Sequence, residues 1–363
     1  MDNENMELNG NGELNENSNK ENRQKKPRKA VKTILIIFLA IVLLIGIAVG
    51  GGLFLINHTL NKMNRVDKSK EQAIPRDMED FEPDERTQGK EDTMDPDQVE
   101  WSDIKAMQDP NVKNILLIGQ DRRPGETGRT RSDSMIIVSI NKNKNIVTMV
   151  SLMRDMYVPI PGYSDNRINA AYAFGGMSLL DEVIKGNFGV VIDGNIEVDF
   201  DGFTRAMSKI APLEIDLKDY EASYLNSWNS GWNLHAGINA LNADQLLAYA
   251  RIRHVGNADY ERTERQRRIL NAAFAKIKTM SATDIYNLVD SVMPSLTTDM
   301  DNGEIMGYVT YYLANRPGMA GDYRLPVDKS FRDEIIRGMM VLVPDLQYNA
   351  KMLQLYLYGK TVN

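Results

Sequence analysis

The run NILLIGQ at residues 114–120 is uninterrupted by charge and ends in a polar loop. Such a short, continuous apolar run is typical of a strand buried on both faces of a sheet. Apolar stretches follow at residues 134–141 and 146–152, with the polar sequence KNKN at 142–145 between them. This order predicts three strands, the last two of which form a hairpin with Asn143 and Lys144 in its turn.

The predicted hairpin decides which polar side chains meet. With Asn143 and Lys144 in the turn, Asp133 lies directly opposite Arg154. Arg131 and Asp155 come to the same end of the hairpin, and Asp121 follows the first strand. Ligands of open α/β sheets bind near such strand ends, so these residues are candidates for a site. Taken alone, Asp133 and Arg154 are equally well explained as an ordinary cross-strand ion pair.

Helical and strand-like patterns alternate over the rest of the chain. The alternation predicts an α/β fold, with a central mixed sheet flanked by helices on both faces. The remaining helices are predicted at residues 169–174 and 177–185 (around Gly175-Gly176), 203–210, 241–250 (opened by Asn242), 284–292, 304–314 and 333–342, and the remaining strands at 195–200 and 213–217.

Residues 249–268 form a second informative stretch, YARIRHVGNADYERTERQRR. Arg251 and Arg253 alternate with apolar residues, which predicts extended backbone with both guanidinium groups on one side. Beyond Asp259 the period becomes helical, with an apolar stripe at Ile269, Leu270, Ala273, Phe274 and Ile277.

Extending that stripe toward the N-terminus at about 100° per residue meets Gln266, Arg262 and Asp259, with Arg268 on the opposite side. A guanidinium group does not face a protein core unless an anion meets it. A salt bridge between Arg262 and Asp259 would account for one arginine. Arg251, Arg253 and Gln266 would remain, and they favour an anion-binding site.

Composition narrows the chemistry. The chain has 363 residues, a net charge of −7, no cysteine and three scattered histidines. The absence of cysteine excludes thiol catalysis and disulfides. The scattered histidines do not support a histidine-based zinc site. The sequence contains neither a Gly-x-x-x-x-Gly-Lys phosphate loop nor a Gly-x-Ser-x-Gly turn. Forked guanidinium groups suit phosphate oxygens, and two nearby carboxylates suit Mg²⁺, so the polar residues indicate phosphoryl-group chemistry.

The N-terminal region predicts a membrane anchor. Residues 1–32 are polar and end in a basic block, and residues 34–56 carry no charge. A run of this length spans a hydrocarbon core of about 30 Å. We expect a disordered cytoplasmic tail at 1–32, an uncleaved transmembrane helix at 33–57, an acidic extracellular linker at 58–110 and an extracellular domain at 111–363. A cleaved signal peptide is the alternative.

Several separated blocks resemble the LytR-CpsA-Psr family of cell-envelope proteins. They are NILLIGQD (114–121), RSD (131–133), SLMRD (151–155), RINAAYAFGG (167–176), VDFDGF (198–203), and LLAYARIR (246–253) with Asp259 and RTERQR (262–267). The resemblance is close over residues 111–270. One departure is Ala211-Pro212, where the family often has Gly-Gly.

The resemblance implies transfer of a glycopolymer, such as teichoic acid or capsule, from an undecaprenyl-pyrophosphate carrier to a muramic acid hydroxyl of peptidoglycan. The new bond would be a phosphodiester. It further implies a set of roles for individual residues. Asp121 and Asp133 would hold Mg²⁺, Asp259 and Arg131 would complete the catalytic group, and the substrate phosphates would be bound by Arg154, Arg251, Arg253, Arg262 and Gln266.

Two other functions stay open. Family members have been described as transcriptional attenuators, but an acidic extracellular domain and a short cytoplasmic tail do not fit nucleic-acid binding. A non-catalytic module that binds polyprenyl phosphate would need the arginines but not both Asp121 and Asp133. Activity measurements on carboxylate variants separate binding from catalysis.

Overall fold

The computed structural model describes residues 57–120, 128–198, 207–252 and 279–361, together with residues 205, 265, 268, 269, 272, 273 and 276. The predicted tail and nearly all of the predicted anchor lie outside these residues. No helix in the described part of the chain is long and apolar enough to cross a membrane.

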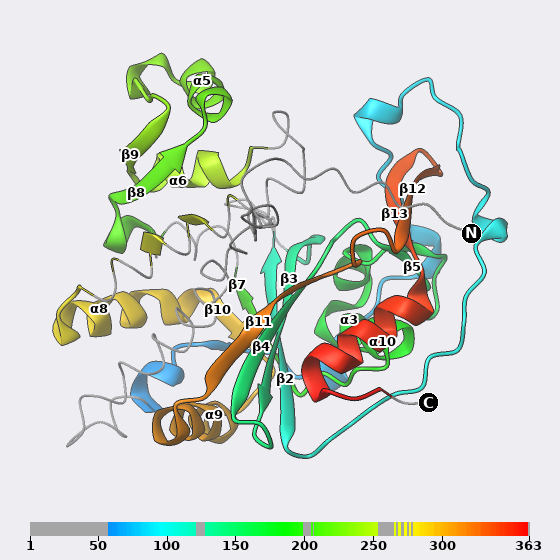
Figure 1. Ribbon diagram of the computed structural model, residues 1–363, viewed down its shortest axis with the longest axis horizontal. Coiled ribbons are helices and arrows are strands. Elements are labelled where there is room, and N and C mark those ends of the chain that lie inside the picture. Colours follow the sequence, from blue (N-terminus) through cyan, green and yellow to red (C-terminus); the bar gives the residue numbers. More distant parts are fainter. Residues whose placement is uncertain are drawn as a thin grey trace, which may run out of the picture.

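A seven-stranded mixed sheet forms the centre of the molecule (Figure 1). Its strands, in spatial order, are β1 (Asn64–Arg65), β10 (Leu296–Thr298), β7 (Gly194–Val198), β2 (Val112–Gln120), β3 (Ser132–Asn141), β4 (Ile146–Leu152) and β11 (Gly318–Leu325). The pairs β1–β10, β7–β2 and β4–β11 are parallel, and the other neighbours are antiparallel. The mixed α/β architecture predicted from the sequence is confirmed.

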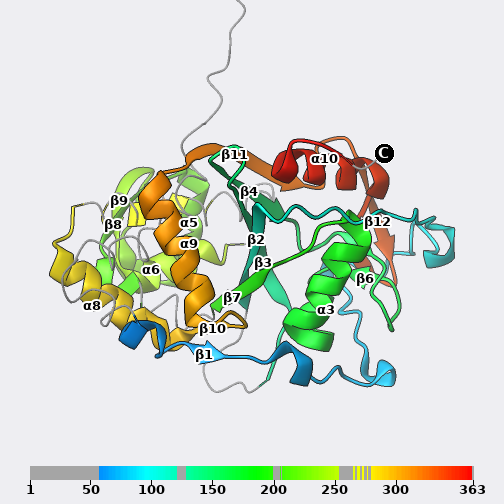
Figure 2. The ribbon, with the colours of Figure 1, turned by 90° about the horizontal axis from the view of Figure 1, so that it is seen from below.

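Helices cover both faces of this sheet (Figures 1 and 2). One face carries α3 (Ala170–Phe188) and α10 (Leu346–Tyr358), and the other carries α5 (Asp219–Trp228), α6 (Ala243–Ala250), α8 (Ala282–Val292) and α9 (Asn302–Asn315). Ile115 packs into the core on the α6 side, and the adjacent Leu116 packs into the core on the α3 side. Both faces are apolar, which explains why the strand sequence is continuous rather than alternating.

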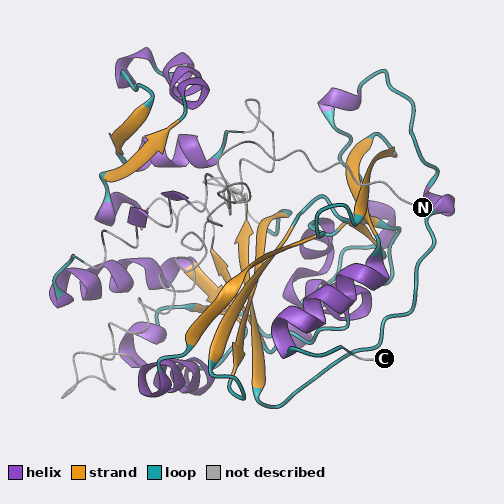
Figure 3. Cartoon of the chain, in the orientation of Figure 1, coloured by secondary structure: helices purple, strands orange, loops and turns teal. Residues whose placement is uncertain are grey.

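In the described part of the chain, three two-stranded sheets lie outside the central sheet (Figure 3). They are β5 (Tyr157–Val158) with β6 (Asn166–Arg167), β8 (Leu213–Leu217) with β9 (Gly237–Leu241), and β12 (Phe331–Ile336) with β13 (Met339–Pro344). The last pair corrects the sequence analysis, because the helix predicted at 333–342 is wrong. Arg337 and Gly338 have φ of 51° and 72°, and positive φ at both positions makes the tight turn of a β-hairpin.

The helices predicted at 169–174 and 177–185, 241–250, 284–292 and 304–314 are present, whereas those at 203–210 and 269–277 lie partly outside the described residues. The two predicted around Gly175-Gly176 form α3, whose regular geometry breaks at Gly176 (φ 70°, ψ −152°). Helix α6 begins after Asn242, whose side chain accepts from the Gln245 backbone while Gln245 returns a bond to Asn242. This reciprocal cap is the reason that the sequence signal at Asn242 was reliable.

Residues 57–110, named here the N-terminal strap, run along the domain (blue to cyan in Figure 2). Besides β1 and a helical turn at residues 57–60, the helical elements of the strap are single turns of 3₁₀ helix. The 3₁₀ turns of the described chain are η1 (Lys68–Lys70), η2 (Arg76–Met78), η3 (Glu85–Thr87), η4 (Pro96–Gln98), η5 (Ser230–Trp232) and η6 (Met293–Ser295).

The strap nevertheless lies on the domain instead of hanging free as a tether. Trp101 donates to Asp165 at 2.6 Å, and its ring centroid lies 6.2 Å from that of Tyr157. Phe81 and Val99 pack against a small apolar cluster with β12 and β13. The acidic composition of the strap indicated a solvated linker, but its Trp101, Phe81 and Val99 side chains have partners on the domain.

Candidate functional site

Asp133 stands in a β-bulge at the start of β3. Gly119 of β2 pairs with Ser134, and the next residue, Gln120, pairs with Ser132, so Asp133 has no opposite residue on β2. A bulge redirects the side chain of the extra residue and is common next to functional sites. Asp121 lies outside the described residues, but it follows directly on Gln120. The two strands are side by side, as predicted.

Asp133 meets Arg154 as the predicted hairpin requires. Met135 pairs with Leu152 in the register that a turn at residues 143–144 dictates, and Arg154 Nη1 lies 2.8 Å from Asp133 Oδ1. The two side chains are only 16% and 11% exposed, so this ion pair is largely desolvated. The pairing is confirmed, and it is consistent both with a site and with a structural ion pair.

Arg131 extends this cluster toward the strap. Its Nε lies 2.9 Å from Glu82 Oε2, its Nη2 donates to the Asp80 carbonyl at 2.5 Å, and its Cζ lies 5.9 Å from the Phe174 ring centre. Burial lowers the pKa of Arg131, Glu82 and Asp80 oppose that shift, and Arg167 adds to it. The carboxylates of Glu82 and Asp80 therefore compensate part of the desolvation of this guanidinium group.

Arg167 belongs to the same network of ion pairs, and the sequence analysis did not single it out. It was part of a family block, and it stands next to Arg131. Its side chain is 6% exposed, with Nη1 3.3 Å from Asp84 Oδ2 and 3.7 Å from Asp155 Oδ1. Asp155 Oδ1 is also 3.5 Å from Arg154 Nε. One carboxylate therefore links Arg167 to the Asp133–Arg154 pair.

A buried polar group holds the end of β2 in place. Gln120 donates to Glu197 Oε1 at 2.7 Å and accepts from the Thr130 backbone at 3.1 Å. The Tyr172 hydroxyl also donates to Glu197, and burial together with that carboxylate raises the pKa of Tyr172. These bonds fix the backbone immediately before Asp121.

Arg251 ends helix α6 as its C-terminal cap, with φ −94° and ψ −4°. The extended backbone predicted at this residue is wrong, because the helix continues to Ala250 and its hydrogen bonds reach the Arg251 amide. In the view of Figure 1, this end of α6 is directed toward the end of the sheet where β2 stops. The predicted site residues Asp121, Arg253, Asp259, Arg262 and Gln266 lie outside the described residues.

A fully buried arginine is found at Arg265, one position before the predicted Gln266. Arg265 Nε lies 2.7 Å from Glu221 Oε1, and Nη1 donates to the Ile252 carbonyl at 3.0 Å. Arg268, predicted on the outward side, instead donates to the Tyr249 hydroxyl at 3.0 Å and lies 3.3 Å from Glu221. The apolar stripe did not reveal these residues because Glu221, their anion, lies on another helix.

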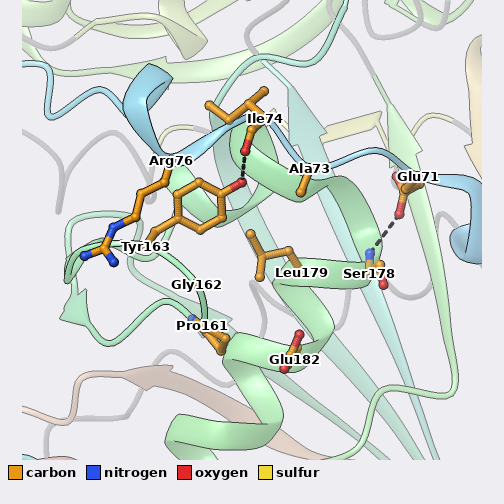
Figure 4. A pocket seen from close by; sticks show the side chains of 11 residues that line it. Glu71, Ala73, Ile74, Arg76, Pro161, Gly162, Tyr163, Ser178, Leu179 and Glu182 are labelled. Carbon is orange, nitrogen blue, oxygen red and sulfur yellow. Dashed lines mark hydrogen bonds between the residues drawn. The ribbon is translucent and has the colours of Figure 1, made fainter.

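A pocket of about 360 Å³ lies between the strap and α3 (Figure 4). Tyr163 donates to the Ile74 carbonyl across it, and Glu71 accepts from the Ser178 amide at 2.8 Å. None of the predicted site residues lines this pocket. Of the predicted site residues that the structure describes, Arg131, Asp133 and Arg154 lie where β2 ends and β3 starts, away from this pocket.

A mixed sheet covered on both faces, with arginines and carboxylates gathered at one end, defines an α/β domain suited to an anionic ligand. The chain belongs to the LytR_cpsA_psr family, whose sequence model matches residues 77–355. The resemblance inferred from the separated sequence blocks is confirmed.

Among its relatives is regulatory protein MsrR of Staphylococcus aureus, 35% identical over 174 residues. That match covers 46% of this chain and 52% of MsrR, so it spans about half the length of this relative. A longer match is to TagU of Oceanobacillus iheyensis, a polyisoprenyl-teichoic acid–peptidoglycan teichoic acid transferase. It is 29% identical over 285 residues, 76% of this chain and 80% of TagU.

Solved structures share the fold. TagT bound to LI-WTA has a TM-score of 0.54 and 22% identity, covering 79% of this chain and 97% of TagT. The protein YwtF (TagT) with bound octaprenyl pyrophosphate lipid has a TM-score of 0.51 and 22% identity, covering 69% and 93%. At these identities the likeness establishes the architecture.

Proposed function

We propose that this protein transfers a glycopolymer from a polyprenyl-pyrophosphate carrier to a hydroxyl group of peptidoglycan. The acceptor oxygen forms a bond to the phosphorus that carries the glycan, and the bond to the second phosphorus breaks. The products are a phosphodiester-linked polymer and a polyprenyl phosphate, and the hydroxyl proton leaves to a base. Teichoic acid is the polymer that the name of TagU supports.

The observation that carries the proposal is the desolvated Asp133–Arg154 pair at the bulge where β2 ends. Arg131 and Arg167 lie in the same network of ion pairs. In phosphoryl transfer the protein acts mainly by positioning groups and neutralising charge, and fixed guanidinium groups supply both. The octaprenyl pyrophosphate lipid named for one YwtF (TagT) structure belongs to the same chemical class as the carrier proposed here.

The proposal includes a Mg²⁺ ion that would be bound by the carboxylates of Asp133 and Asp121. The donor chemistry fits, because carboxylate oxygens are the ligands that Mg²⁺ prefers, and because Asp121 directly follows Gln120 at the end of β2 while Asp133 lies at the paired start of β3. Bound Mg²⁺ would neutralise pyrophosphate charge. The phosphates would be bound by Arg131, Arg154, Arg251, Arg253, Arg262 and Gln266. Asp259 would orient these arginines or accept the proton of the hydroxyl group.

The same proposal places the reaction at a membrane. The uncharged run at residues 34–56 and the basic residues before it support a single-pass anchor with the domain outside the cell. A polyprenyl carrier is confined to the membrane, so an anchored transferase would stay close to its donor.

The test is transfer by the full chain from a polyprenyl-pyrophosphate-linked glycan to peptidoglycan. We expect Asp133→Asn to lower the rate by about a hundredfold or more, because one preorganised charge is lost. Binding of the carrier should change far less, since the arginines still hold the ground-state anion. Asp77→Asn, an exposed change on the strap, is the matched control.

Two outcomes would overturn the proposal. Transfer at the wild-type rate by Asp133→Asn, with undiminished activity in a chelator, would remove the magnesium-assisted mechanism. Carrier binding without transfer by the wild-type chain would make it a lipid-phosphate binding module.

A further inference from the structure

The strap presents a row of carboxylates to two buried arginines of the domain. Glu82 Oε2 lies 2.9 Å from Arg131 Nε and 3.7 Å from Arg167 Nη2, so one carboxylate oxygen faces both guanidinium groups. Asp84 Oδ2 lies 3.3 Å from Arg167 Nη1, and Asp80 Oδ2 lies 3.8 Å from Arg131 Nη2. An oxyanion between two guanidinium forks is the arrangement by which proteins bind phosphate.

The arginines are buried, whereas Glu82 and Asp80 are exposed; Asp84, which also meets Arg167, is mostly buried. Arg131 and Arg167 side chains are 10% and 6% exposed, whereas those of Glu82 and Asp80 are 55% and 64% exposed. Glu82 also has a φ of 46°, in the left-handed region that costs a residue with a side chain conformational energy. An exposed carboxylate on a strained backbone leaves its partner at little cost.

The strap does not satisfy these arginines completely. Arg131 Nη1 and Arg167 Nε are buried and have no hydrogen-bond partner in the described part of the chain. A buried donor without an acceptor is costly, and most are satisfied in folded proteins. A phosphate group has more acceptor oxygens than a carboxylate and could satisfy donors that Glu82 leaves open.

The two arginines are also connected to the proposed catalytic pair. Asp155 Oδ1 lies 3.7 Å from Arg167 Nη1 and 3.5 Å from Arg154 Nε, and Arg154 contacts Asp133. An anion at Arg131 and Arg167 would therefore lie within the same set of ion pairs as the proposed phosphoryl-transfer site.

We propose that Arg131 and Arg167 form an anion subsite for a phosphate group of the substrate, and that Glu82 of the strap occupies this subsite until the phosphate displaces it. The inference rests on the proposed function, since it takes the substrate to be a phosphate-containing anion. The phosphate comes either from the carrier pyrophosphate or from the phosphodiester backbone of the polymer.

The test is isothermal titration of the full chain in detergent with three probes: inorganic pyrophosphate, farnesyl pyrophosphate and a glycerol-phosphate oligomer. Glu82→Gln keeps the shape of the side chain and removes its charge, so we expect about two- to fivefold tighter binding. Arg167→Gln should weaken binding about tenfold or more, and Arg167→Lys should recover part of that loss. Glu85→Gln, an exposed strap residue, should change nothing.

The probes distinguish the source of the phosphate. Weaker binding of both pyrophosphates to Arg167→Gln assigns the subsite to the carrier, whereas weaker binding of the oligomer alone assigns it to the polymer. Wild-type affinities in both Glu82→Gln and Arg167→Gln overturn the subsite. If Arg154→Gln still loses pyrophosphate binding in that case, the proposed function stands. A wild-type chain that binds none of the probes overturns both.

Discussion

Buried arginines occur on both sides of the sheet, but they meet different kinds of anion. Near α6, Arg265 and Glu221 are each 1% exposed and lie 2.7 Å apart. Near α3, Arg131 is 10% exposed, while its partner Glu82 is 55% exposed. The first pair is closed to solvent, and the second is covered from outside by a segment distant in sequence.

This difference separates a structural ion pair from an exchangeable one. Removing Glu221 would take a carboxylate at 2.7 Å away from a buried guanidinium group, where solvent does not reach to replace it. Removing Glu82 exposes Arg131 to solvent or to another anion. Similar burial of the arginines therefore does not imply similar roles, because the exposure of the anion decides whether a ligand can take its place.

The largest effect is expected from Glu221→Gln. The substitution removes the charge of the carboxylate that lies 2.7 Å from the buried Arg265 and weakens the contact of Arg268, so we expect a loss of about 3–5 kcal/mol in the free energy of unfolding. Urea denaturation measures this loss. Glu214→Gln, an exposed change on the neighbouring strand β8, is the control. A stability equal to that of the control would contradict the structural role of the pair.

A smaller loss is expected from Glu71→Ala on the strap. Glu71 accepts from the Met177 and Ser178 amides at 3.2 and 2.8 Å, where the break at Gly176 starts a new helical segment of α3. Losing such a cap costs about 0.5–2 kcal/mol. Thermal unfolding measures the change, with the exposed Glu182→Ala in the same pocket as control. An unchanged melting temperature would mean that the strap does not stabilise α3.

The third prediction concerns the buried attachment of the strap through Lys68. Lys68 Nζ lies 2.8 Å from Asp181 Oδ2 and 2.7 Å from Asp299 Oδ2. Burial raises the pKa of Asp181 to about 6, although Lys68 opposes the shift. Burial alone would lower the pKa of Lys68, but the two carboxylates raise it, so Lys68 stays charged throughout the acid range.

Because the folded-state pKa of Asp181 lies above its unfolded value, the folded protein binds the extra proton between about pH 4 and pH 6. Stability should therefore fall as pH rises through this window, by on the order of 1–2 kcal/mol. Asp181→Asn should remove that part of the slope in denaturation curves taken from pH 4 to pH 7. An identical slope in wild type and variant would refute the assignment to Asp181.

The centre of the fold was predictable because its signals are local. Continuous apolar runs predict the buried strands. The tight turn at residues 143–144 fixes the register that places Asp133 opposite Arg154. The helix at 243–250 was found through its cap at Asn242. Each of these signals lies within a few residues of the feature it specifies.

The predictions from sequence failed where contacts between residues distant in the chain determine the local structure or the burial of a side chain. Ile335, Ile336, Met339 and Met340 fit a helical spacing, but Arg337-Gly338 turns the chain and pairs them as strands. Arg265 is buried because Glu221 on α5 meets it, and Arg167 because the strap meets it. The acidic composition of the strap indicated solvent exposure. No pattern within the strap sequence predicts which arginines of the domain it contacts.

The smallest effect is expected from Asp80→Asn. Its carboxylate is 64% exposed and 3.8 Å from Arg131, while its backbone carbonyl, which the substitution keeps, accepts the shorter bond. Exposed pairs contribute about 0.2–1 kcal/mol, so the melting temperature should barely change.

Salt makes the comparison sharper, because it screens exposed charges far more than buried ones. The loss caused by Asp80→Asn should vanish at about 1 M NaCl, whereas the loss caused by Glu221→Gln should persist. If both losses respond equally to salt, the distinction between an exchangeable strap carboxylate and a structural core carboxylate fails.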